Sequence, residues 1–331
     1  MSVAKPPYRA DHVGSLLRPE PVKQARKKFY EEKSISAQDL KEIEDAAIID
    51  LIKMQEDVGL PVVTDGEARR AYWHYDFMGG LTGLDMEEKP GAVTFTTTAT
   101  LPLSPVINGP LDFPSDHPML EHFAFVRDHT KVMPKISIPG PSCCHFRTAV
   151  DDIHVPEYRE DPQALFAALA ATYAKAVQGF YEIGCRYLQM DDIFFAYLCD
   201  PKHREAKAAV GQDPDWLIDR YAWMLREAIK DRPADMAIGM HLCRGNFKST
   251  FAAQGNYEPV AEALLSEMNL DAIFMEYDDD RSGDFRPLRY LKPGRIVVLG
   301  LVTTKFGQLE SKDDLKRRIA EAASFAPLDQ L

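Results

Sequence analysis

MAIGMHLCRGN, residues 236–246, is the stretch on which the fold depends. Its first half is a short apolar run typical of a buried strand, and His241 and Cys243 follow at its carboxyl end. Side chains two positions apart on a strand lie on the same face. An imidazole and a thiol are therefore directed to one point, with a reach suited to a single zinc ion. For an isolated H-x-C pair, simple packing in the core is the alternative interpretation.

Six further short apolar runs alternate with stretches of helical periodicity, which predicts a parallel sheet covered on both faces. The predicted strands end at Ser15, Thr64, Pro139, Met190, Leu242, Met275 and Gly300. The principal predicted helices cover residues 37–58, 162–183, 215–230, 257–268 and 311–323, with Ser36 and Ser311 as N-caps of the first and the last.

Polar side chains gather where these strands end, as at the active-site rim of a (β/α)8 TIM-type barrel. An open doubly wound sheet concentrates its ligands at one crevice instead, so the barrel is the better fit. Only seven strands are found, and the sequence stops at residue 331, where an eighth would begin. Either a segment of the insertion at about 71–134 closes the barrel, or this chain lacks its natural C-terminus. We expect one α/β catalytic barrel over residues 1–331 whose eighth strand is missing from this chain.

Residues of about 71–134 interrupt the regular alternation. The threonine-rich segment 94–101 has high strand propensity, so a long insertion containing a β-hairpin is predicted. Its aromatic residues Tyr72, Trp73, Tyr75 and Phe77 either form a stacking wall for a ligand or fill the core of the insertion.

Composition excludes several classes of partner. The formal net charge is −12 without a block of lysine or arginine, which argues against nucleic acid and against anionic membrane surfaces. No apolar run approaches the length of a transmembrane helix, and the first ten residues lack a signal-peptide core. The five cysteines form no disulfide framework and suit a reducing cytoplasm.

Glu276 ends the strand after the H-x-C strand, so its carboxylate can join His241 and Cys243 as a third zinc ligand. Three protein ligands with an open fourth position are the catalytic zinc arrangement. Asp191 and Glu67 are rim acids suited to a ligand amino group, with a structural salt bridge to a nearby arginine as the alternative. Ser15 is placed to contact a ligand carboxylate.

Two other sequence patterns are weaker evidence of a functional site. The acidic run 278–280 superficially matches a calcium loop but lacks the glutamate at the twelfth position, so a solvated turn is expected. Either one of Cys143 and Cys144 lines the rim, or both are small packing residues.

With these residues in hand, the sequence resembles the catalytic C-terminal barrel of cobalamin-independent methionine synthase, particularly the short single-barrel members of that family. The resemblance spans nearly the whole chain. Its landmarks are VGSLLRP (13–19), TDGEARR (64–70), IPGP (138–141), LQMDD (188–192), HLCRGN (241–246), FMEYDDDRSGDF (274–285) and LGLVTTKFGQLESKDDLKRRI (299–319).

The resemblance implies a cytoplasmic methyltransferase that uses Zn²⁺ held by His241, Cys243 and Glu276. It implies that 5-methyltetrahydrofolate donates the methyl group to the thiol of homocysteine, making methionine. Homocysteine would lie against Val13, Gly14 and Ser15, with Glu67 and Asp191 at its amino end.

Two departures from the family pattern matter. The family's fourth zinc ligand is a cysteine that follows a segment like FAPLDQL, and this sequence ends before it. Where the long synthases have a histidine acid, this sequence has Lys305, which becomes the candidate proton donor.

Two alternative functions therefore stay open. One is a zinc alkyltransferase joining another thiol, such as coenzyme M, to an epoxide. The other is a non-catalytic barrel that binds a small ligand.

Overall fold

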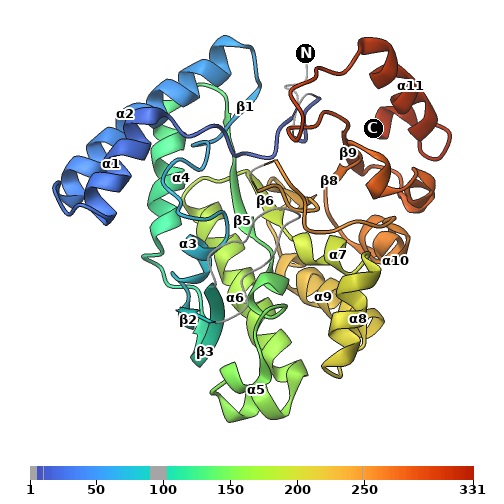
Figure 1. Ribbon diagram of the computed structural model, residues 1–331, viewed down its shortest axis with the longest axis horizontal. Helices are drawn as coiled ribbons and strands as arrows, with labels where there is room; N and C mark the ends of the chain where they lie inside the picture. The colour runs from blue at the N-terminus through green and yellow to red at the C-terminus, as the bar shows by residue number, and fades with distance from the viewer. Residues whose placement is uncertain (1–5, 10, 90–102, 248) are drawn as a thin grey trace.

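The computed structural model describes residues 6–9, 11–89, 103–247 and 249–331. Its centre is a parallel sheet of five strands in the order β5-β6-β7-β8-β9 (Figure 1). These strands are β5 Ile136–Pro139, β6 Tyr187–Asp191, β7 Ala237–Leu242, β8 Ala272–Glu276 and β9 Ile296–Gly300. They are short and mostly buried, as expected for parallel strands covered by helices. The chain is therefore an α/β protein.

A sixth parallel strand lies beside this sheet. β1 (Val62–Val63) pairs with β4 (Met133–Pro134), which runs directly into β5. The Lys135 N–H donates to the Val63 carbonyl at 2.9 Å and continues the ladder. Six of the seven predicted strands are thus confirmed. The parallel ladders of the described residues form this pair and the five-stranded sheet, and an eight-stranded closed barrel is not among them.

Helices surround the sheet, with α6 and α9 packed side by side (Figure 1). The helices are α1 Glu20–Tyr30, α2 Ala37–Asp57, α3 Tyr75–Met78, α4 Pro118–His129, α5 Pro156–Glu160, α6 Pro162–Glu182, α7 Ile193–Tyr197, α8 Pro201–Ala209, α9 Pro214–Ile229, α10 Glu258–Ala261 and α11 Lys312–Ala322. Ser36 and Ser311 cap α2 and α11, as predicted: each side chain accepts a backbone N–H three residues on. None of these helices is long and apolar enough to cross a membrane.

The predicted insertion contains the expected antiparallel hairpin, formed by β2 (Thr82–Glu88) and β3 (Leu103–Asp112). The threonine-rich segment assigned to it lies outside the described residues. The insertion also holds α4, which the sequence analysis missed and which packs on α2. A small second core forms there, with Ile48, Ile52 and Val126 among its members.

The first predicted strand, ending at Ser15, is wrong. The described residues from Asp11 to Pro19 have no regular secondary structure. Gly14 has a φ of +118°, which is outside the strand region and open only to glycine. The segment is nevertheless held tightly, because its carbonyl oxygens accept hydrogen bonds from Thr64 Oγ1 (2.6 Å) and Gln189 Nε2 (2.7 Å).

A buried ion pair anchors the same segment. Lys135 Nζ lies 3.1 Å from Asp11 Oδ1, and both side chains are fully buried. The ammonium also lies 4.5 Å from the centre of the Phe274 ring, a cation–π contact. Burial lowers the pKa of Lys135, while the charge of Asp11 opposes that shift.

Replacing Lys135 by methionine leaves the Asp11 carboxylate buried without its cation. We expect the free energy of unfolding to fall by about 3 kcal/mol, as is typical when one partner of a buried pair is removed. Urea denaturation measures it. Lys175→Met, which breaks an exposed pair with Asp112, is the matched control and should change little. Equal stabilities of the two variants would show that the buried pair does not anchor the segment.

Candidate active site

One cavity of about 850 Å³ opens at the carboxyl ends of β6 to β9. The N-terminal segment and residues 72–75 complete its wall. Of the residues predicted to bind zinc or substrate or to donate a proton, all but Gly14 line the cavity, and Gly14 lies between Val13 and Ser15. The lining residues are Val13, Ser15, Glu67, Asp191, His241, Cys243, Glu276 and Lys305. The interpretation of Cys143 and Cys144 as packing residues is confirmed, because both are buried and neither lines the cavity.

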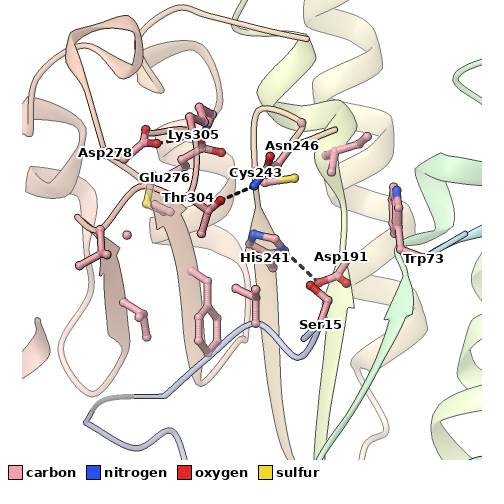
Figure 2. Close-up of a pocket in the computed structure, with 18 of the residues that line it drawn as sticks. Ser15, Trp73, Asp191, His241, Cys243, Asn246, Glu276, Asp278, Thr304 and Lys305 are labelled. Carbon is pink, nitrogen blue, oxygen red and sulfur yellow. Dashed lines mark hydrogen bonds and ion pairs between the residues drawn. The ribbon is translucent and has the colours of Figure 1, made fainter. Parts of the chain in front are cut away.

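The register of the sheet places His241 beside Asp191, since the two are paired residues of β7 and β6. His241 Nδ1 lies 3.2 Å from Asp191 Oδ1, as Figure 2 shows. Gln189 donates a hydrogen bond of 2.7 Å to the same carboxylate oxygen. A carboxylate on one ring nitrogen fixes the orientation of an imidazole and supports ligation through the other, Nε2.

Cys243 follows β7 directly. Burial raises the pKa of its thiol to about 12, and the negative charges of Glu276 and Asp191 add to the shift. Without a further positive charge at the sulfur, the thiol is therefore protonated at neutral pH.

Glu276 ends β8 next to Cys243, but its carboxylate is fully engaged. Lys305 Nζ lies 2.8 Å from Oε1, Arg281 pairs with the same oxygen, and the Arg244 backbone N–H donates to Oε2 at 2.7 Å. Among the described residues no three His, Cys, Asp or Glu side chains are arranged to hold a metal. The three predicted zinc ligands thus line one cavity, but they are not arranged as a metal site.

Lys305 also pairs with Asp278 at 2.9 Å, and Arg281 pairs with Asp278 as well. The acidic run was expected to be a solvated turn, but the Asp278 side chain is only 3% exposed. The expectation fails there because two cations neutralise this carboxylate at the cavity wall. Spacing within the run gives no sign of this, since one of the cations comes from residue 305.

The predicted substrate-binding residues divide into two groups. Val13, Gly14 and Ser15 form the segment that crosses the strand ends, and Ser15 is exposed. Glu67 accepts a hydrogen bond of 3.0 Å from Ser137 and lies 3.6 Å from Arg70, so the alternative of a structural ion pair is observed for it. Burial raises the pKa of Glu67, and the Arg70 charge opposes that shift. Asp191 is engaged by His241 and Gln189 rather than by an arginine.

A second wall of the cavity was only partly foreseen. Trp73, His74 and Tyr75 are in successive ring contact, with centroids 4.2 and 4.0 Å apart. Phe77, by contrast, is fully buried against Phe113 in the core. Arg147 and Tyr197 also line this side, and nothing in the sequence distinguished them from other loop and helix residues.

The chain matches the family described as the cobalamin-independent synthase catalytic domain over residues 10–331. It therefore belongs to that family. It is 45% identical to two uncharacterized Bacillus subtilis proteins, YxjH and YxjG, in each case over 99% of this chain and 86% of the relative.

Two solved structures are similar. A Listeria monocytogenes protein, named provisionally as a vitamin-B12-independent methionine synthase, is 37% identical with a TM-score of 0.80, over 98% of this chain and 89% of that one. A B12-independent methionine synthase from Shewanella sp. W3-18-1, solved with selenomethionine, is 19% identical with a TM-score of 0.66, over 90% and 81%. At that identity the second likeness shows the fold alone.

Asp192, which follows the site residue Asp191, makes the stability of the folded protein depend on pH. Its backbone N–H donates to the His241 carbonyl at 3.0 Å, and its Oδ2 has no hydrogen-bond partner among the described residues. Burial raises the pKa of this carboxyl from 3.8 to about 7. The unfolded chain therefore loses this proton near pH 4, whereas the folded protein keeps it until about pH 7.

The contribution of Asp192 to stability accordingly falls as the pH rises from 4 to 7 and is lowest above that range. Asp192→Asn should remove this loss, on the order of 4 kcal/mol at about 1.4 kcal/mol per pKa unit. Denaturation midpoints at pH 5 and pH 8 measure the effect. If the variant and the wild type show the same difference between the two pH values, Asp192 does not titrate in this way.

Proposed function

We propose that this chain is a zinc-dependent methyltransferase that transfers a methyl group from 5-methyltetrahydrofolate to the thiol of homocysteine, making methionine. Family membership supports the methyltransferase class. The observation that carries the proposal is the carboxylate-oriented imidazole of His241 beside Cys243 in one large cavity. We further propose that residues 1–331 act as one barrel-type catalytic unit. The free thiols suit a reducing cytoplasm as its location.

The donor set supports zinc as the cofactor. Imidazole nitrogen, thiolate sulfur and carboxylate oxygen are all zinc ligands. His241 offers Nε2, which makes no hydrogen bond to the described residues, and Cys243 offers its sulfur. Glu276 would complete the set once its carboxylate turns away from Lys305 and Arg281. A bound zinc would supply the positive charge that turns a thiol into a nucleophilic thiolate at neutral pH.

The chain's own residues would position homocysteine. Asp191 and Glu67 give the wall two carboxylates for the substrate ammonium, and Ser15 offers a hydroxyl to its carboxylate. The Glu67 carboxylate keeps only part of its capacity, because Ser137 and Arg70 occupy one of its oxygens. Lys305 lines the cavity wall, from which its Nζ would donate a proton to the departing amine. To do so it must release Glu276 or Asp278, to which it is bound.

A second candidate function, a metal-free barrel that binds a small ligand, is favoured by one observation. Glu276 is held in three interactions that a metal would have to replace. Metal content separates the two functions, because only the methyltransferase requires stoichiometric zinc.

Cys243→Ser tests the proposal directly. A serine hydroxyl is a far weaker zinc ligand than a thiolate, so bound zinc and methionine formation should be lost together. Zinc is measured by inductively coupled plasma mass spectrometry, and methionine by mass spectrometry after incubation with homocysteine and 5-methyltetrahydrofolate. Cys199→Ala, a buried cysteine outside the cavity, is the control and should retain both. Methionine formation by Cys243→Ser at the wild-type rate would refute the assignment.

Lys305→Met should strengthen zinc binding, because it removes one of the two cations that compete for Glu276. We expect the zinc dissociation constant to fall by roughly tenfold, corresponding to about 1.4 kcal/mol. Competition with a chromophoric chelator measures this constant without reference to turnover. Lys312→Met, on the exposed end of α11, is the charge-matched control. Weaker zinc binding in Lys305→Met than in the control would show that Lys305 supports the metal site rather than opposing it.

A further inference from the structure

The cavity has two chemically different sides. Asp191, His241 and Cys243 lie on one, and Figure 2 shows Trp73 standing across the space from Asp191 and His241. The Trp73 side is largely aromatic. A single amino-acid thiol placed against His241 and Cys243 leaves much of a cavity of about 850 Å³ unfilled. The aromatic side is therefore available to a second substrate.

Arg147 is the exception in this aromatic wall, because it brings a permanent positive charge. It follows the short 3₁₀ helix at Pro141–Cys144, beyond the end of β5, and its side chain is half-buried. Its guanidinium carbon lies 5.7 Å from the centre of the Phe194 ring. Burial and the charge of Arg147 together lower the pKa of His74 well below its usual value, so that ring is neutral.

Arg147 has no carboxylate partner. No Asp or Glu oxygen of the described residues lies within 4.0 Å of it, and the residues outside the description include no Asp or Glu. Lys305, the other lysine or arginine that lines the cavity in the described chain, is bound by two carboxylates. The side chains of Tyr75 and Tyr197 hydrogen-bond to Arg147. These phenols are neutral, so the charge of the guanidinium is available to an anionic ligand.

The chemistry of the guanidinium defines what that ligand must carry. Its planar fork of N–H donors matches the two oxygens of a carboxylate, sulfonate or phosphate and binds them with charge-assisted hydrogen bonds. Tyr72 and Trp73, which line the same cavity, offer flat apolar faces to the rest of the ligand.

We propose that Arg147 binds an oxyanion of the second substrate and so selects the methyl donor by its charge. This inference rests on the proposed function in one respect, namely that the cavity holds two substrates at once. Arg147 then determines specificity without contacting the thiol that reacts.

Binding measurements test this without turnover. Isothermal titration calorimetry is run on the wild type, Arg147→Met and Arg147→Lys with three oxyanion probes and one neutral probe. The oxyanion probes are 5-methyltetrahydrofolate, 2-(methylthio)ethanesulfonate and methyl phosphate. The neutral probe is 5-methyltetrahydropterin, which keeps the pterin ring of the first but lacks its p-aminobenzoylglutamate and therefore its carboxylates. Arg159→Met, an exposed arginine on α5 without an ion pair among the described residues, is the charge-matched control.

We expect at least one oxyanion probe to bind the wild type and Arg159→Met, and to bind Arg147→Met at least about tenfold more weakly, as expected for a lost charge-assisted pair. Arg147→Lys should recover part of the loss, and the neutral probe should bind all variants alike. Should Arg147→Met fail to fold, Arg147→Gln is measured in its place.

Unchanged affinity of every oxyanion probe for Arg147→Met overturns the inference. A wild type that binds none of the three, or only the neutral probe, overturns it equally. Homocysteine is titrated into the same preparations after zinc loading. Failure of homocysteine to bind the wild type would refute the proposed function and leave the oxyanion result standing. Homocysteine binding together with an unaffected Arg147→Met would refute only the role of Arg147.

Discussion

The register between β6, β7 and β8 is the constraint from which the site follows. Asp191 is paired with His241, and His241 with Phe274. Cys243, one residue beyond the end of β7, therefore comes level with Glu276, the last residue of β8. A shift of one residue in either ladder would turn His241 to the opposite face of the sheet. The short, buried strands leave little freedom for such a shift, because each apolar side chain has a place in the core. The polar rim is thus a consequence of apolar packing below it.

Charge balance at the rim is the second constraint, and it acts against metal binding. The site collects Asp191, Glu276 and Asp278 within a small region, and two cations, Lys305 and Arg281, neutralise the last two. A divalent ion at His241 and Cys243 would compete with these cations for Glu276. The metal affinity of this chain therefore depends on how readily the ion pairs exchange, and not only on the presence of suitable ligands.

Sequence patterns predicted the sheet well, because each strand is a local apolar run and consecutive strands of this type pair in order. The N-caps of α2 and α11 could also be predicted, because Ser36 and Ser311 each bind a backbone N–H within one helical turn. The N-terminal segment was missed because Gly14 breaks its extended conformation, while distant partners, Thr64 and Gln189, hold it in place. α4 was missed because the aromatic and turn-rich composition of the insertion masks its periodicity.

Asp191, His241, Cys243 and Glu276 were found because they stand at or next to strand ends. The cations that neutralise Glu276 were not recognised as its partners. Lys305 was singled out as an acid, yet its contacts with Glu276 and Asp278 depend on folding across 27 to 29 positions. Arg147 sits in a loop among buried residues, and only the three-dimensional arrangement shows that it lacks an anion. Pairing between distant side chains is the part of the site that a single sequence does not reveal.

X-ray absorption at the zinc edge of zinc-loaded protein tests the central claim most directly, because it identifies the atoms that bind the metal. We expect one sulfur at about 2.3 Å, from Cys243, and nitrogen or oxygen neighbours at about 2.0–2.2 Å, from His241 and Glu276. A shell of nitrogen and oxygen alone, with no sulfur, would contradict it.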